Sequence, residues 1–291
     1  MTTLLPHWYL VGAGNMGTLA AWHLLQAGHN VTVIKAGRGI SLDKTLTLPD
    51  GHSTTLTLPV LPPDVITSPI DYLLVAVKTP YSEAAISAIK NKLHTDSLVI
   101  RFQNGLGALD GLLPTGTTIL EAVSTSAVKG LHPHHQIVAE NTTWLGGPMV
   151  EPDWLRGLQR HWPNLQWCEN VHEPQWKKLV ANVVINPLTA LHDVPNGHVV
   201  DNPALRQQAA LLCAEADAVL QALDPSWPGN SLDSVLAVAR ATAGNTSSMR
   251  ADRQRGAVTE IEAINGWLVK QADKLGMAVP HNRRIVAQLT K

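Results

Sequence analysis

Lys178, Asn182 and Asn186 follow one another at intervals of four residues. Because four residues turn an α-helix by roughly 400°, the three side chains fall within an arc of about 80° on one helix face. Aliphatic residues surround them in the sequence, and a lysine and two amides buried among such neighbours would need polar partners. The spacing therefore predicts either a polar binding face or the solvated face of a surface helix. Pro187 lacks an amide hydrogen and is expected to kink or end this helix.

A glycine-rich loop lies near the N-terminus, between the first expected strand and the first expected helix. It fits the pattern G-x-G-x-x-G of dinucleotide-binding folds, in which the glycines allow a tight turn, the approach of a pyrophosphate and close helix packing. The amides at the start of the helix then point toward the phosphates. A plain glycine-rich turn is the alternative. The residues predicted to bind the cofactor here are Gly12, Gly14, Asn15, Met16 and Gly17.

The segment after the second expected strand indicates which dinucleotide is bound. An NAD site usually has an acidic residue there, which holds the 2′-hydroxyl of the adenosine ribose. This chain instead has Lys35 and Arg38, with no acid between them. Both cations could contact a 2′-phosphate through charge-assisted hydrogen bonds, so we expect NADP(H) in preference to NAD(H). Solvated loop charges are the alternative.

The expected elements divide the chain into two parts. Up to about residue 170, short apolar strands alternate with helices, which is typical of a doubly wound, Rossmann-type α/β domain. Beyond that point only long stretches with helical periodicity follow. We therefore expect an NADP-binding Rossmann domain over residues 1–170 and an all-helical substrate-binding domain over residues 171–291. The expected strands cover residues 9–11, 31–34, 45–48, 55–58, 72–77, 98–102 and 165–168, and the expected helices residues 16–26, 82–93, 174–191, 202–223, 231–243 and 259–275.

Several segments in both parts resemble the ketopantoate reductase (2-dehydropantoate 2-reductase) family. The most specific is residues 176–191, WKKLVANVVINPLTAL, which contains the lysine and the two asparagines. The others are residues 103–107 (QNGLG), 195–197 (PNG), 245–249 (NTSSM) and 259–266 (TEIEAING), in the order that the family has them. The resemblance covers essentially the whole chain. It implies an oxidoreductase that uses NADPH to reduce 2-dehydropantoate to pantoate for pantothenate and coenzyme A biosynthesis.

The resemblance also implies roles for residues at matching positions. Lys178 is implied to donate a proton to the ketone oxygen, and Glu260 to contact both cofactor and substrate. The family commonly has arginine where this chain has Ala36, so NADP selectivity would depend here on Lys35 or Arg38. The residues implied to hold the substrate are Asn182, Asn186, Asn196 and Ser248, and those implied to lie near the nicotinamide are Lys78, Asn104, which we also expect to contact substrate, and Val128.

The residue types suit the reduction of a ketone. Hydride addition leaves negative charge on the oxygen, so a proton donor must lie beside it. Lysine can transfer its proton as well as supply charge, and with an ordinary pKa near 10.4 it is protonated at neutral pH. Glu260 lies in the pattern T-x-x-E, which predicts a capping box with Thr259 as N-cap and Glu262 reaching back. Glu260 would then lie in the first turn, where it either contacts a ligand or only complements the helix dipole. Ser248 could likewise bind a carboxylate or serve as a turn residue.

Composition limits the remaining classes of function. The formal net charge of −1 argues against a general nucleic-acid binder. Two cysteines do not suggest a disulfide framework, and no apolar stretch reaches the length of a membrane helix, so we expect a soluble, cytoplasmic protein. The pairs His132/His134 and His134/His135 have no cysteine or acidic residue placed as a third ligand, so we expect no metal and an exposed turn around Pro133. Two other functions stay open: a reductase of another small 2-keto acid, and a non-catalytic NADP(H)-binding sensor.

Overall fold

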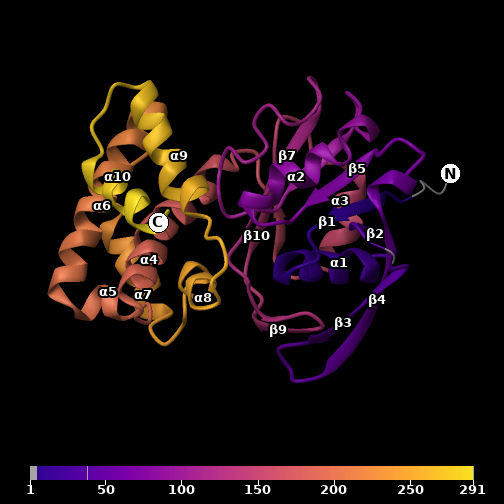
Figure 1. Cartoon of the computed structure of the whole chain (residues 1–291), viewed down its shortest axis with the longest axis horizontal. Helices are drawn as coiled ribbons and strands as arrows, with labels where there is room; N and C mark the ends of the chain where they lie inside the picture. The colour runs from indigo at the N-terminus through magenta and orange to yellow at the C-terminus, as the bar shows by residue number, and fades with distance from the viewer. Residues whose placement is uncertain (1–4, 38, 291) are drawn as a thin grey trace. The chain divides into compact units, whose positions relative to one another are not determined.

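The computed structural model describes residues 5–37 and 39–290, and the chain divides into two compact units (Figure 1). The first unit comprises residues 1–103 and 109–171, and the second comprises residues 104–108 and 172–291. Among the described residues every strand belongs to the first unit, whereas the second is helical. The predicted fold class, an α/β part followed by a helical part, is confirmed. The segment 104–108 belongs to the helical unit, whereas the expected division at residue 170 puts this segment in the first domain.

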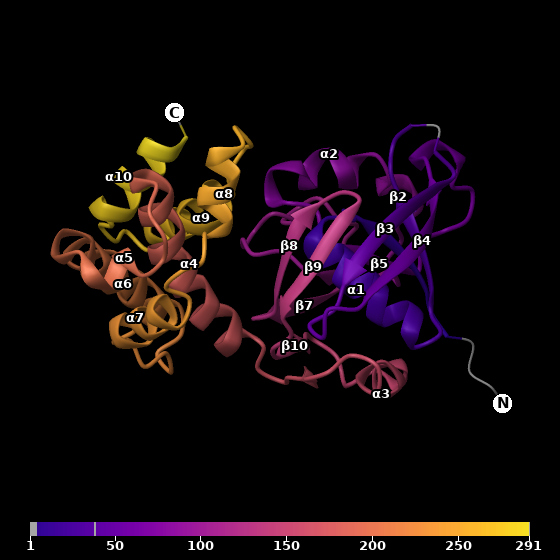
Figure 2. The ribbon, with the colours of Figure 1, turned by 90° about the horizontal axis from the view of Figure 1, so that it is seen from below.

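The first unit is built on an eleven-stranded sheet, which Figure 2 shows from a second direction. Its central strands have the order β7-β6-β5-β1-β2-β4, and all neighbours in this part are parallel, as in a doubly wound dinucleotide-binding sheet. Beyond β7 lie β10 and then β11, and beyond β4 lie β3, β9 and β8. The strands are β1 (His7–Val11), β2 (Asn30–Ile34), β3 (Ser41–Thr47), β4 (Ser53–Leu61), β5 (Tyr72–Val75), β6 (Leu98–Arg101), β7 (Thr118–Ser124), β8 (Ala127–Leu131), β9 (His134–Ala139), β10 (Thr143–Gly146) and β11 (Leu165–Trp167).

One helix of the first unit, α2 (Ser82–Ser87), is shorter than the sequence predicts. The helices of this unit are α1 (Asn15–Gln26), α2 and α3 (Asp153–Gln159), with 3₁₀ helices at Pro63–Val65, Thr79–Tyr81 and Lys90–Lys92. The expected helix over residues 82–93 is therefore wrong beyond Ser87. Ile86 and Ile89 are both fully buried and lie three residues apart, a spacing that puts side chains on one side in either kind of helix. The apolar pattern alone could not separate an α-helix from a helix that breaks into a 3₁₀ turn.

The hairpin formed by β8 and β9 corrects the expectation for the histidines. An exposed turn was expected around Pro133, and His132 does lie in it. His135, however, belongs to β9 and is only 4% exposed, because β9 pairs with β3 in the interior of the unit. Within residues 5–37 and 39–290 no group of histidine, cysteine and acidic side chains could hold a metal ion.

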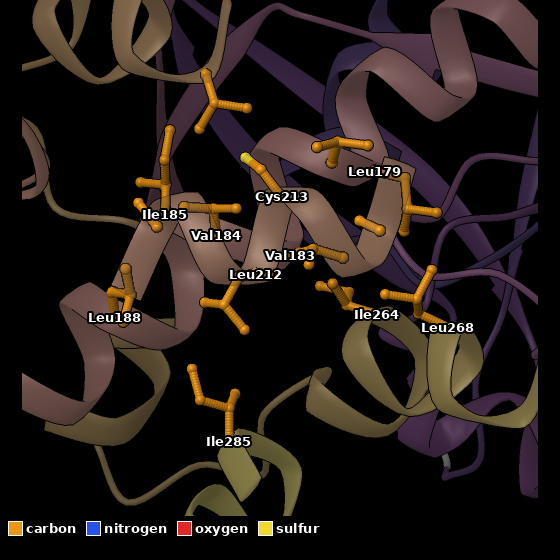
Figure 3. Close-up of a cluster of buried hydrophobic side chains, with 14 of the residues drawn as sticks. Leu179, Val183, Val184, Ile185, Leu188, Leu212, Cys213, Ile264, Leu268 and Ile285 are labelled. Carbon is orange, nitrogen blue, oxygen red and sulfur yellow. The ribbon is translucent and has the colours of Figure 1, made fainter. Parts of the chain in front are cut away.

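The second unit consists of helices packed around α4. The helices are α4 (His172–His192), α5 (His198–Asp201), α6 (Pro203–Leu223), α7 (Leu232–Ala241), α8 (Ser248–Gln254), α9 (Ile261–Lys274) and α10 (Pro280–Leu289). Figure 3 shows buried side chains of α4, among them Leu179, Val183 and Leu188, in one apolar cluster with side chains of α6, α9 and α10. Leu106, from the segment 104–108, joins this cluster, and its amide donates to the Ala263 carbonyl at 2.8 Å. No helix in the described part of the chain is long and apolar enough to cross a membrane.

Pro187, which the sequence predicts to kink or end the helix, does not end α4. The helix continues to His192 with Pro187 inside it. A proline removes the amide that would bond the carbonyl four residues earlier, which here is Val183. The buried side chain of Asn265 on α9 supplies the missing donor, with Nδ2 2.9 Å from the Val183 carbonyl oxygen. A side chain from another helix therefore donates the hydrogen bond that the Val183 carbonyl loses because of Pro187.

Candidate active site

The glycine-rich loop of the first unit joins β1 to α1. Gly12 has a φ of +97°, and a Cβ there would overlap the backbone of Ala76 and Val77 beyond the end of β5. A Cβ at Gly17 would overlap the Gly12 carbonyl, so this glycine lets α1 pack closely on the loop. At Gly14, the N-cap of α1, a Cβ would meet nothing within 4 Å. The open space beside Gly14 and the unbonded first amides of α1 fit the pyrophosphate of a dinucleotide.

The other predicted cofactor residues of this unit follow strand ends or line α1. Lys35 directly follows β2 and is exposed, and Lys78 is a partly buried residue just beyond β5. Both positions are at the carboxyl ends of parallel strands, where α/β sheets bind ligands. Val128 on β8 and Met16 on α1 are partly buried against the same core. Arg38 lies outside the described residues.

The row of polar side chains on α4 forms the centre of the second unit's candidate site. Lys178 keeps part of its surface open, but its ammonium is desolvated, and this lowers its pKa from about 10.5 to about 8. The negative charge of Glu260 acts in the opposite direction and raises that pKa. A lysine with such a pKa is still largely protonated at neutral pH, and it gives up its proton more readily than an exposed lysine does.

Glu260 is fixed between α9 and the segment 104–108. It is only 6% exposed, and the side-chain amide of Asn104 donates to Glu260 Oε2 at 3.5 Å. The expected capping box is wrong, because the N-cap of α9 is Glu260 and not Thr259. No side chain caps this end, so the carboxylate of Glu260 lies at the positive end of the helix dipole. The arrangement holds a buried anion beside the Lys178 ammonium.

Two asparagines extend the row along α4. Asn182 is partly exposed and Asn186 is 6% exposed, and within the described residues neither side chain has a hydrogen-bond partner. A buried amide without a protein partner normally bonds water or a ligand. Lys178 and Asn186 are eight residues apart, so the row spans about 12 Å along the helix axis. Both amides can therefore serve a small polar ligand whose one end faces the lysine.

Asn196 lies in the turn that follows α4, and Ser248 is the first residue of α8, which packs against α4. Asn196 donates through Nδ2 to Thr242 Oγ1 at 3.0 Å, and its buried Oδ1 has no partner among the residues that the structure describes. The N-cap of α8 is Ser247, which accepts from the Arg250 amide at 3.1 Å and bonds Thr189 of α4 at 2.7 Å. Ser248 is thus not the capping residue, and its exposed hydroxyl remains available for another role.

In the second unit the structure brings Glu260 together with Lys178 and Asn104, and in the first unit it keeps the glycine-loop residues together at the start of α1. Sequence reasoning did not foresee that Asn104, which follows β6, would cluster with the helices. It also missed Ser247 and Asn265, whose roles are to cap α8 and to bond the carbonyl opened by Pro187. The pattern N-T-S-S before a helix could have indicated a serine cap, but not which serine.

Comparisons with known proteins identify the family of the chain. The family model for "Ketopantoate reductase PanE/ApbA" matches residues 8–148, and the model for its C-terminal part matches residues 170–291. The chain belongs to the ketopantoate reductase family. Among its relatives in that family, the 2-dehydropantoate 2-reductase of Shigella flexneri is 31% identical over 286 residues, which are 95% of this chain and 91% of that protein.

Solved structures show how widely this family's fold is used. The dimeric ketopantoate reductase from Staphylococcus aureus superposes with a TM-score of 0.85 at 22% identity, over 98% of each chain. D-mandelate dehydrogenase, solved with NADH and anilino(oxo)acetate, superposes with a TM-score of 0.80 at 19% identity, over 97% of each chain. At such identities the likeness concerns the fold alone, so the substrate must be argued from side chains.

Proposed function

We propose that this protein reduces 2-dehydropantoate to pantoate with NADPH, in the biosynthesis of pantothenate and coenzyme A. The observation that carries the proposal is the polar row on α4, in which a desolvated Lys178 ammonium lies beside the buried Glu260 carboxylate. Membership of the ketopantoate reductase family supports the same reaction. Two cysteines without a disulfide, Cys168 and Cys213, are consistent with a reducing compartment, and we infer that the enzyme works in the cytoplasm.

Each residue of the site has a defined task in this reaction. Bound NADPH supplies the hydride that reduces the ketone carbon. Lys178 donates its proton to the ketone oxygen, where negative charge develops, and Glu260 keeps that lysine protonated through its own charge. Asn182 and Asn186 hold the hydroxyl groups of the substrate, and Asn196 and Ser248 hold its carboxylate. Asn104 orients Glu260 through their hydrogen bond.

The residues proposed to hold the cofactor belong to the first unit, with Glu260 and Asn104 added from the second. Gly12, Gly14 and Gly17, with the backbone of Asn15 and Met16, make room for the pyrophosphate and present amides to it. Lys35 and Arg38 are proposed to bind the 2′-phosphate, and Lys78 and the backbone of Val128 to contact the nicotinamide end.

Replacing both Lys35 and Arg38 by alanine is expected to raise KM for NADPH and to leave the use of NADH nearly unchanged. The reason is that only NADPH carries the 2′-phosphate that the two cations would neutralise. Steady-state kinetics with both cofactors measures the effect. Equal losses with NADPH and NADH would show instead that the two cations stabilise the loop.

Asn182→Ala and Asn186→Ala are each expected to raise KM for 2-dehydropantoate roughly twofold to tenfold, which corresponds to the loss of one hydrogen bond of about 0.5–1.5 kcal/mol. Their kcat should change little, because an amide can bind a hydroxyl but cannot supply the proton. Gln208→Ala, which removes an exposed amide from α6, is the matched control. An unchanged KM in both asparagine variants would show that this face of α4 does not bind the substrate.

A panel of 2-keto acids tests the proposed reaction directly. The purified protein is mixed with NADPH and each acid, and the loss of NADPH absorbance is followed. The proposal requires the highest kcat/KM with 2-dehydropantoate. A higher value with another 2-keto acid would identify a related reductase, and NADPH binding without turnover of any acid would identify a sensor.

A further inference from the structure

A buried lysine lies against the glycine-rich loop and has no role in the mechanism described above. Lys44, on β3, is only 2% exposed. Its ammonium donates to the Ala13 carbonyl of the glycine-rich loop at 2.5 Å and to His135 Nε2 at 3.0 Å. Lys44 and Leu46 lie on the same face of β3, and Leu46 pairs with His135 of β9, which explains how the lysine and the histidine meet.

His135 continues the contact from Lys44 to the start of α1. A lysine ammonium can only donate, so His135 Nε2 accepts and the ring proton lies on Nδ1. That Nδ1 donates to the side-chain oxygen of Asn15 at 2.7 Å. Burial and the nearby Lys44 charge lower the pKa of His135 to about 4, so the ring is neutral at physiological pH. Figure 2 shows β9 beside β3 with α1 next to them, and the hydrogen bonds join these three elements at the loop.

No acidic side chain in the described part of the chain balances the charge of Lys44. Within the described residues no carboxylate pairs with Lys44, and the nearby charge that affects it is the cation Lys35. Burial and Lys35 together lower the pKa of Lys44 to about 8. The N-terminus of α1 adds partial positive charge at the same place, and no acidic residue lies in its first turn. The glycine-rich loop therefore carries an excess of positive charge, and the space beside Gly14 is open. An anion bound there would be attracted by this charge and would stabilise the loop.

We propose that Lys44 is a positioning residue for the diphosphate of the dinucleotide, holding the glycine-rich loop through the Ala13 carbonyl and adding a buried positive charge beneath it. His135 holds the lysine in this position and couples it to Asn15, the first residue of α1. This inference rests on the proposed use of a nicotinamide dinucleotide. The diphosphate is common to NADPH and NADH, so Lys44 contributes to the binding of both cofactors, unlike Lys35 and Arg38.

The test is the Kd of NADPH and of NADH, measured by fluorescence titration for the wild type and for Lys44→Met. Methionine keeps the length and apolar character of the side chain and removes the charge. We expect both Kd values to rise about tenfold or more, as for the loss of one buried charge near an anion. The melting temperature of the cofactor-free protein should change little, because removing an unbalanced buried charge offsets the two lost hydrogen bonds. Lys90→Met removes an exposed charge from the same unit and should leave both Kd values unchanged.

The pH dependence of Kd separates this role from a purely structural one. Only the charged form of Lys44 attracts the diphosphate, so wild-type affinity for both cofactors should fall as pH rises from 7 to 9, through the lysine's pKa of about 8. Around Lys44 lie Lys35 after β2, His135 on β9, and the neighbouring His132 and His134. The pKa values of His132 and His135 are lowered, so neither ring gains charge in this range. In Lys44→Met the fall should be absent.

Three results would overturn the inference. The first is an unchanged Kd with a lowered melting temperature in Lys44→Met, which would make Lys44 purely structural. The second is a weaker affinity for NADPH alone, which would mean that the charge of Lys44 acts on the 2′-phosphate and not on the diphosphate. The third is a fall in affinity between pH 7 and pH 9 that persists in Lys44→Met. Absence of NADPH binding by the wild-type protein would instead refute the proposed function itself.

Discussion

Lys178→Ala is expected to lower kcat roughly 10²- to 10⁴-fold, the usual contribution of a positioned general acid. The variant should still fold, because Lys178 keeps part of its surface open and is not a member of the apolar cluster around α4. It should also still bind NADPH, because the glycine-rich loop belongs to the other unit. The measurement is kcat with 2-dehydropantoate and NADPH, together with the Kd of NADPH by fluorescence titration.

Two further variants make this experiment decisive. Lys178→Arg should remain poor, because a guanidinium keeps the charge but scarcely gives up its proton. Lys177→Ala is the matched control, since Lys177 is exposed and pairs with Glu173 one turn earlier at 2.6 Å, a surface ion pair worth about 0–1 kcal/mol. It should keep most of the activity. An inactive Lys177→Ala beside an active Lys178→Ala would refute the assignment of Lys178.

The sequence predicted those parts of the fold whose signals are local. A window of about twenty residues is enough to predict the glycine-rich loop between β1 and α1, the apolar strands in the centre of the sheet and the long periodic helices. The strands β7 to β10 carried no such signal and were not foreseen. His135 illustrates the reason, since its burial depends on the pairing of β9 with β3, which lies ninety residues earlier in the chain. A local sequence pattern does not predict which distant strands pair with each other.

The continuation of α4 through Pro187 has the same kind of cause. Proline disfavours a helix interior because its ring crowds the carbonyl four residues earlier and because that carbonyl loses its donor, and a side chain that replaces the donor removes the second of these costs. Asn265 does so from α9, more than seventy residues later, and is held in turn by a bond to Asn282 at 2.9 Å. The consequence reaches the candidate site, because the unbroken helix keeps Asn186 in line with Lys178.

The candidate site was predictable as a set of side chains but not as an electrostatic unit. The spacing of four residues is enough by itself to put Lys178, Asn182 and Asn186 on one face of α4. What spacing could not supply was the partner of the lysine. The negative charge of Glu260 acts on Lys178 from the start of another helix, and Asn104 reaches that carboxylate from a loop far away in the sequence. Burial has the largest effect on the pKa of the proposed acid and lowers it, and the interaction that opposes this effect comes from another helix.

Glu260→Gln is expected to lower kcat/KM at pH 8 roughly tenfold or more and to change its dependence on pH. The proposed acid must be protonated, so wild-type kcat/KM should be constant below pH 8 and fall above it, following the Lys178 pKa of about 8. The charge of Glu260 raises that pKa, and glutamine removes the charge while keeping an oxygen that can accept from Asn104. In the variant the lysine therefore loses its proton at a lower pH, and the fall in kcat/KM should begin at a lower pH than in the wild type.

Glu262→Gln is the matched control, because Glu262 is exposed in the first turn of the same helix. Both substitutions remove one negative charge near the N-terminus of α9, which costs about 0.3–1 kcal/mol of stability in either case. Only the change at Glu260 should move the pH profile, because the nearby charge that raises the pKa of Lys178 is that of Glu260. An activity loss in Glu260→Gln that is the same at every pH would mean that the carboxylate binds substrate or cofactor without affecting the lysine. A pH profile displaced equally in both variants would mean that the effect comes from the helix end as a whole.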